Sequence, residues 1–115
     1  MTSLKSTLKI KETDIQASIC DYLEIRRRFF FRVNNIPAFN KHGDGSISMR
    51  RLPKHTPRGL PDIIVIVGGV FYGLEVKKEG GKQSPEQKII EKDIKAHGGK
   101  YFVVRSIDDV KAIGL

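Results

Sequence analysis

Two apolar runs joined by a Gly-Gly pair constrain the fold of this chain more than any other feature of its sequence. Residues 62–67 (DIIVIV) and residues 70–77 (VFYGLEVK) are rich in β-branched and aromatic side chains. Gly68 and Gly69 lie between them, and a two-residue Gly-Gly connection is typical of tight hairpins, whose loop residues need positive φ. The pattern therefore predicts a two-stranded antiparallel hairpin in the second half of the chain.

The register of this hairpin brings two acidic residues together. If Val67 pairs with Val70, counting back along both strands places Asp62 directly opposite Glu75. Opposed residues have Cβ atoms about 5 Å apart, and like charges at that separation are destabilising unless something compensates them. A hard divalent cation such as Mg²⁺ or Mn²⁺ would do so, since it takes one or two protein carboxylates and keeps waters or phosphate oxygens in its other positions.

Lys77 adds a cation to the same site. Side chains alternate along a strand, so Lys77 shares a face with Glu75, while Val76 points into the core and offers its backbone carbonyl as a further metal ligand. A bound metal lowers the pKa of a water, and a lysine beside it can orient that water or stabilise charge on a phosphate. These residues predict metal-dependent hydrolysis of a phosphodiester; a plain salt bridge between Lys77 and Glu75 is the structural alternative.

The other expected elements complete an α/β fold with a small mixed β-sheet flanked by helices. They are a helix at 12–25, a strand at 29–33, a long loop at 34–60 with a short strand around 47–52, a helix at 85–97, a strand at 101–104 and a short helix ending near 113. The core order is α-β-β-β-α-β. Because 115 residues are fewer than the roughly 150 of a typical domain, residues 1–115 are expected to form one domain.

The basic residues are concentrated in one third of the chain. The net charge is +8, and residues 26–58 hold nine Lys and Arg against one acidic residue. Such a concentration favours binding to a polyanion, although a solvated surface is the simpler alternative. The candidate DNA contacts are Arg26, Arg27, Arg28, Arg32, Arg50, Arg51, Lys54 and Arg58.

Cysteine content and hydropathy indicate the compartment. Cys20 is the only cysteine, so the sequence predicts neither a disulfide framework nor a cysteine-based zinc site. The longest apolar run, residues 63–71, is much shorter than the ~20 residues that span a bilayer, and residues 1–14 do not have the apolar centre of a signal peptide. We therefore expect a soluble cytoplasmic protein without a membrane partner.

The order of these motifs resembles that of a known family of nucleases. Gly59-Leu60-Pro61-Asp62, then Glu75-Val76-Lys77, then Gln87 on the next helix is similar to the pattern of the PD-(D/E)XK superfamily. The sequence around these motifs resembles the virus-type replication-repair nuclease (VRR-NUC) family, over about residues 12–105. The resemblance implies a restriction-endonuclease-like core and a Mg²⁺- or Mn²⁺-dependent endodeoxyribonuclease.

The same resemblance suggests two more site residues. The family places an acid on the first helix near the metal, and Glu12 matches it best, with Gln16 one turn further on the same face and Asp14 as the competing acid. Gln87 would orient groups in the active site, but Ser84-x-x-Gln87 is equally explained by a capping box.

Small stand-alone members of this family are similar to Holliday junction resolvases and act as homodimers. The expected function is therefore a structure-specific endonuclease that cuts branched DNA, such as a four-way junction, in replication, recombination or repair. A symmetric junction needs paired incisions, which two copies of a one-site chain could make. A flap, nicking or restriction-type nuclease, or a non-catalytic nucleic-acid-binding module, are the alternatives.

Overall fold

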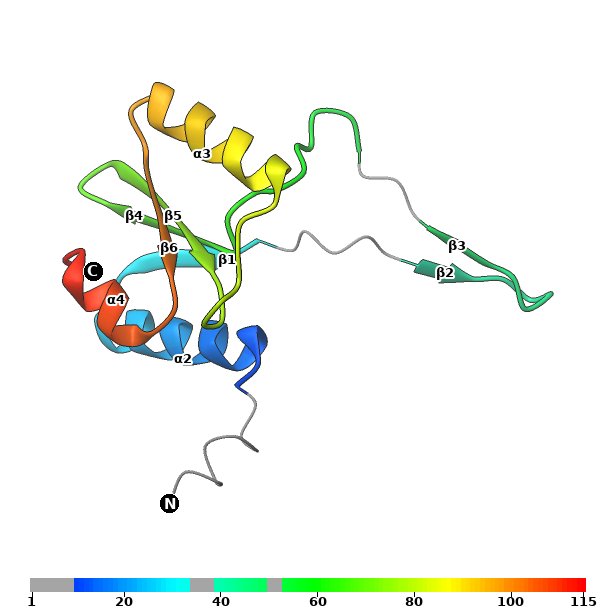
Figure 1. The fold of residues 1–115 in the computed structure, drawn as a ribbon, viewed down its shortest axis with the longest axis horizontal. Coiled ribbons are helices and arrows are strands. Elements are labelled where there is room, and N and C mark those ends of the chain that lie inside the picture. Colours follow the sequence, from blue (N-terminus) through cyan, green and yellow to red (C-terminus); the bar gives the residue numbers. More distant parts are fainter. Residues whose placement is uncertain (1–9, 34–38, 50–52) are drawn as a thin grey trace, which may run out of the picture.

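The computed structural model describes residues 10–33, 39–49 and 53–115. Its elements are α2 (Glu12–Ile25), β1 (Phe29–Arg32), β2 (Phe39–Lys41), β3 (Ile47–Met49), β4 (Ile63–Val67), β5 (Val70–Val76), α3 (Pro85–Ala96), β6 (Lys100–Val104) and α4 (Ile107–Ala112). Figure 1 shows α2 and α4 on one side of a central sheet and α3 on the other. Within the described ranges, no helix is both long and apolar enough to cross a membrane.

The central sheet is mixed, with strand order β1-β4-β5-β6. β4 runs antiparallel to β1 and to β5, whereas β5 and β6 are parallel. Val67 pairs with Val70, and the hairpin ladder continues to Ile63 opposite Leu74, which confirms the expected register. The fold class expected from the sequence is therefore confirmed.

The main core lies between the sheet and the α2–α4 layer. Strand side chains alternate, so one face of the hairpin presents Val65 and Leu74, which are fully buried. They pack with Ile19 and Leu23 of α2 and with Val110 of α4. This packing fixes α2 beneath the ends of β4 and β5, where the acidic pair lies.

A capping box starts α3. The Ser84 hydroxyl accepts a hydrogen bond from the Gln87 backbone N–H (3.2 Å), and the Gln87 amide oxygen accepts one from the Ser84 N–H (2.8 Å). Pro85 occupies the first helical position, where a missing N–H costs nothing. The helix start expected from these residues is confirmed.

The expected long loop at 34–60 contains a structure that sequence reasoning only partly anticipated. β2 and β3 pair antiparallel as a separate two-stranded ribbon, which Figure 1 shows standing away from the body of the protein. The short strand expected around 47–52 is present over 47–49, and residues 50–52 lie outside the described part of the chain. β2 was missed because a three-residue strand carries too short a pattern to be recognised.

Candidate metal and active site

The loop at residues 59–61 packs closely against α3 and β5 and positions Asp62 at the end of the hairpin. Gly59 has φ of +84°, and a Cβ there would lie 2.7 Å from the Glu86 carbonyl carbon at the start of α3. Pro61 packs across the hairpin on Gly73, where a Cβ would lie 2.6 Å from the Pro61 ring. Only glycine fits both positions, so the loop is seated between α3 and β5 and places Asp62 immediately before β4.

Asp62, directly before β4, is hydrogen-bonded to the last residue of β5 and to the residue after β1. Its side-chain Oδ2 accepts a hydrogen bond from the backbone N–H of Val76 (2.7 Å), the last residue of β5. Its backbone carbonyl accepts one from the N–H of Val33 (2.8 Å), directly after β1. The carboxylate is thus held at the β5 end of the hairpin, as the register predicted.

Glu75 is a buried carboxylate with an unsatisfied oxygen. The residue is only 2% exposed; its Oε2 lies 3.4 Å from the Lys77 ammonium, and its Oε1 has no hydrogen-bond partner in the described structure. Burial, followed by the hydrogen-bonding contact and the charge of Asp62, raises the pKa of Glu75 to about 8, against the opposing effect of Lys77. The side chain therefore lies in a position where its charge needs compensation.

This donor set fits a hard divalent cation. Within the described ranges, no group of three or more His, Cys, Asp or Glu side chains could hold a metal. The acidic pair, Asp62 and Glu75, is nevertheless enough for Mg²⁺ or Mn²⁺, which commonly bind one or two carboxylates and otherwise waters or phosphate oxygens. The unsatisfied oxygen of Glu75 is the observation that favours a cation here.

The first helix turns two polar side chains toward this end of the sheet. The Glu12 Oε2 accepts a hydrogen bond from the Lys78 N–H (3.3 Å), and the Gln16 amide lies 3.5 Å from the Asp62 carbonyl oxygen. Asp14 instead lines a surface groove near the start of α4. Of the two competing acids, Glu12 is the one that the structure places beside the site, although as a partner of the backbone rather than within a carboxylate cluster.

Arg105 clamps the turn that follows Lys77, and sequence reasoning missed it. Its guanidinium donates to the backbone carbonyls of Lys78 (2.6 Å) and Gly81 (3.0 Å). The same turn presents the Lys78 N–H to Glu12. The parallel register of β5 and β6, which only the structure shows, pairs Val76 with Val104 and so places Arg105 beside Lys77.

Tyr101 borders the same face of the sheet. It lies opposite Gly73 on the neighbouring strand, is 3% exposed, and its hydroxyl accepts a hydrogen bond from the Gln83 side chain (3.2 Å). Burial raises its pKa to about 12, an effect that this hydrogen bond opposes and that the charge of Glu75 increases. The phenol therefore stays neutral at physiological pH.

Arg26 and Arg28 have a structural role at the opposite end of the sheet. Both donate through Nε to the Leu115 carbonyl oxygen at 3.2 Å, and Arg28 also donates to that of Gly114 at 3.1 Å. Arg27 is exposed and has φ of 57°. Phe29, the first residue of β1, pairs with Ile66 near the hairpin turn. The three arginines precede Phe29, so they are separated from the acidic pair by the length of the hairpin, roughly 17 Å.

The remaining basic candidates are arranged differently. Arg32 ends β1 and donates to the Gln16 amide oxygen (2.7 Å), which places its guanidinium at the Asp62 end of the sheet. Lys54 and Arg58 are exposed on the segment that leads back to Asp62. Arg50 and Arg51 lie outside the described residues.

Gln87 takes part in the capping box at the start of α3. Its amide oxygen and its backbone N–H are both bonded to Ser84, so the structure confirms the capping box. The loop at Gly59 packs against the backbone of Gln87, with a hypothetical Cβ 2.8 Å from its nitrogen. Gln87 therefore supports the Asp62 loop, and its part in orienting reacting groups stays a prediction.

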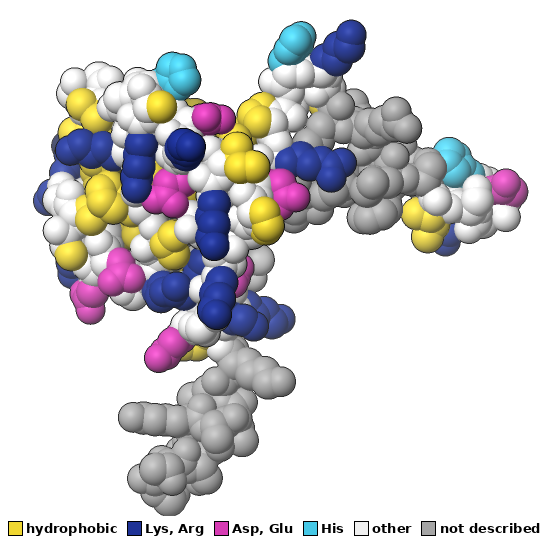
Figure 2. Space-filling model, turned by 45° about the horizontal axis from the view of Figure 1, so that its top comes forward, with side chains coloured by type: hydrophobic (Ala, Val, Ile, Leu, Met, Phe, Trp, Pro, Cys, Tyr) yellow, Lys and Arg dark blue, Asp and Glu magenta, His cyan; other side chains and the backbone are white. Residues whose placement is uncertain are grey.

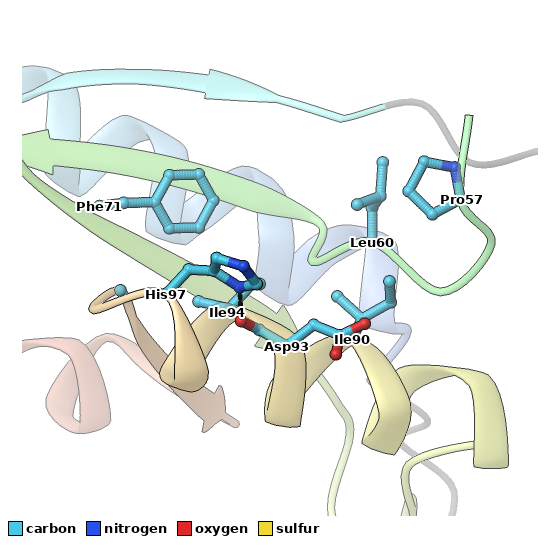
Figure 3. Close-up of a pocket in the computed structure, with 8 residues that line it drawn as sticks. Pro57, Leu60, Phe71, Ile90, Asp93, Ile94 and His97 are labelled. Carbon is cyan, nitrogen blue, oxygen red and sulfur yellow. Dashed lines mark hydrogen bonds between the residues drawn. The ribbon is translucent and has the colours of Figure 1, made fainter. Parts of the chain in front are cut away.

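A separate apolar cavity of about 410 Å³ lies between α3 and the sheet. Figure 3 shows Phe71, Leu60, Ile90 and Ile94 around it. The other lining residues are Pro57, Asp93, His97 and Gly99. Since it contains a single carboxylate, this cavity is a poor candidate for a metal or phosphate site.

The fold matches known structures of one class. One solved structure, described as "VRR_NUC domain", superposes with a TM-score of 0.62 and 23% identity, covering 91% of this chain and 95% of that one. A second, described as "VRR_NUC domain protein", has a TM-score of 0.63 and 18% identity over 92% and 86% of the two chains. No protein-family model matches the sequence, and no curated protein does.

The chain therefore has the VRR_NUC fold over most of its length. This is the fold that the resemblance in the sequence implied.

Proposed function

We propose that this chain is a metal-dependent endodeoxyribonuclease of the PD-(D/E)XK type that cuts branched DNA, such as a Holliday junction, as a homodimer. The observation that carries the proposal is the buried Glu75 carboxylate beside Asp62, with an oxygen that no described group satisfies. A cation would satisfy that oxygen, and it would also bring an anionic phosphate to a site that otherwise repels it.

In this proposal each group of the site has its own task. Asp62, Glu75 and the carbonyl of Val76 would hold Mg²⁺ or Mn²⁺, and Glu12 is proposed as a further ligand. The bound ion supplies a water of lowered pKa and positive charge against the phosphate. Lys77, which is 12% exposed and lies 3.4 Å from Glu75, offers its ammonium to the attacking water or to a phosphate oxygen.

Paired cutting of a symmetric substrate motivates the homodimer. The described part of the chain holds one acidic pair of this kind, so one copy would make one incision. Two copies related by a two-fold axis would match the symmetry of a four-way junction and cut two strands.

A substrate panel with a mass measurement tests this function. Linear duplex, flap, splayed-arm and four-way junction DNA are incubated with Mg²⁺, with Mn²⁺ and with a chelator, and solution mass is measured by light scattering. We expect symmetric paired nicks in the junction, only with metal, by a species of twice the chain mass. Binding without cutting on every substrate and with both metals would instead support a non-catalytic module.

Arg105 provides a prediction about positioning. Replacing it by Gln removes both hydrogen bonds to the turn at 78–81, so Lys77 and Glu12 lose their common support. We expect kcat to fall by about tenfold or more and the metal concentration for half-maximal cleavage to rise, as for other residues that orient ligands.

Arg26→Gln is the matched control for Arg105→Gln. Arg26 also donates a guanidinium hydrogen bond to a backbone carbonyl, that of Leu115, but at the far end of the sheet. It should lower thermal stability with little effect on kcat. Equal losses of kcat in the two variants would assign Arg105 a purely structural role.

A further inference from the structure

The β2–β3 ribbon is an isolated element with an exposed tip. β2 and β3 make their extensive contacts with each other, and Figure 1 shows them outside both helical layers. The described side chains from 41 to 47 are all exposed, including Ile47 at 66%. A two-stranded hairpin is only marginally stable in water by itself, so this one is suited to binding another molecule.

The chain segment that contains the ribbon begins and ends beside the candidate active site. The chain leaves the sheet at Val33 and re-enters it at Asp62, and these two residues are joined by a backbone hydrogen bond of 2.8 Å. Lys41 is eight residues from Val33 and thus at most about 28 Å from it along the chain. This is less than one turn of B-DNA, about 34 Å, so Lys41 reaches only the duplex immediately beside a phosphate held at the site.

The charge of the ribbon and its return segment favours a polyanion. Lys41, Lys54 and Arg58 are exposed and form no ion pair within the described ranges. Asp44, the only acidic residue between 26 and 58, is occupied in the tip, where its Oδ1 accepts from the Ser46 N–H (2.9 Å) and hydroxyl (2.6 Å). Figure 2 shows Lys and Arg side chains between the body and the ribbon.

We infer that the ribbon is a duplex-binding arm that lies in the major groove of the DNA next to the phosphate held by the acidic pair. The major groove accepts a two-stranded β-ribbon, and lysine and arginine at its root bind the flanking phosphates. This inference rests on the proposed function for the identity of the nucleic acid and deepens it by assigning the surface that holds the duplex. A second copy of the chain is the competing occupant, and its charge at this surface would be repulsive.

The test compares DNA binding by full-length variants that carry Asp62→Asn to prevent cutting. In one, residues 39–49 are replaced by a short Gly-Ser turn; in another, Lys41→Gln and Lys54→Gln remove two free cations. Fluorescence anisotropy in chelator measures the Kd for a labelled four-way junction between 50 and about 200 mM salt. We expect the ribbonless variant to bind about tenfold more weakly, and the double variant to have a salt slope smaller by about 1.8.

Lys92→Gln with Lys100→Gln is the charge-matched control, since Lys92 is exposed on α3 and Lys100 begins β6 at the sheet end away from Asp62. It should leave the salt slope nearly unchanged. Dimethyl sulfate footprinting should show guanine N7 atoms that are protected by the protein with the ribbon and are accessible without it.

Three results would overturn the inference: equal affinity with and without the ribbon, an unchanged N7 pattern, or a loss of half the solution mass on its removal, which would assign the ribbon to a subunit contact. Cleavage by the unmodified chain separates the two proposals. If the DNA is cut but binding does not depend on the ribbon, only the inference about the ribbon is disproved. If binding depends on the ribbon but no DNA is cut, only the proposed nuclease activity is disproved.

Discussion

Asp62→Asn is expected to lower phosphodiester cleavage by about 10³-fold or more while leaving the fold intact. The amide retains an oxygen that can accept the hydrogen bond from the Val76 N–H, so the end of the hairpin stays in place. It removes the negative charge that would hold a divalent cation opposite Glu75, and metal-assisted hydrolysis depends on that charge. Single-turnover cleavage of four-way junction DNA in saturating Mn²⁺ measures the effect.

The control for this variant is Asp108→Asn. Asp108 is an exposed acid in the first turn of α4 and forms no hydrogen bond or ion pair with the described residues, so its neutralisation should leave the cleavage rate within about twofold. Junction binding in chelator should survive in both variants. Undiminished cutting by Asp62→Asn, from protein shown to be free of contaminating nuclease, would disprove the site.

Glu75→Gln is expected to abolish cutting and yet to stabilise the metal-free protein above neutral pH. The folded protein holds the Glu75 proton up to a pKa of about 8, whereas an unfolded chain releases it near the ordinary value of 4.5. Between these values the folded state binds one more proton, so the free energy of unfolding decreases as pH rises from about 4.5 to 8. Glutamine has no such proton, and its variant should lack that decrease.

Thermal unfolding in chelator from pH 5 to pH 9 measures this difference. At pH 9 we expect the Tm of Glu75→Gln to exceed that of the parent by about 5 °C, with the two curves converging toward acid pH. Added Mg²⁺ or Mn²⁺ should raise the Tm of the parent, most strongly at high pH where Glu75 is ionised, and should do little for the variant. Parallel pH curves for the two proteins would show that the pKa of Glu75 is not raised in the folded protein.

Several features of the fold were predictable because they depend on residues close together in the chain. Gly68 and Gly69 determine the type of turn, and the turn determines the register of both strands. Ser84 and Gln87 satisfy one another's backbone groups and so determine where α3 begins. Local chemistry of this kind needs no partner from elsewhere in the molecule.

The sequence predicted only those parts of the site that follow from the hairpin register. The hairpin placed Asp62 and Glu75 together with Lys77 beside them, and the structure agrees. The burial of Glu75 could not be predicted, because β6 pairs along the edge of β5, α3 lies over this side of the sheet, and both come later in the chain. Burial is what leaves its oxygen unsatisfied.

Long-range contacts decided the roles of the basic residues. Their concentration in the sequence suggested one phosphate-binding surface, but tertiary packing separates them. Arg26 and Arg28 donate hydrogen bonds to the backbone carbonyls at 114–115, whereas Arg32 lies near Asp62. Arg105, which the sequence did not suggest as a site residue, donates hydrogen bonds to the turn beside Lys77. By itself, then, the sequence determined the hairpin, its acidic pair and the helix starts, through short-range turn and capping chemistry. Only the tertiary structure decided which charges are buried, paired or free, because those states depend on neighbours as far as 89 residues apart in the chain.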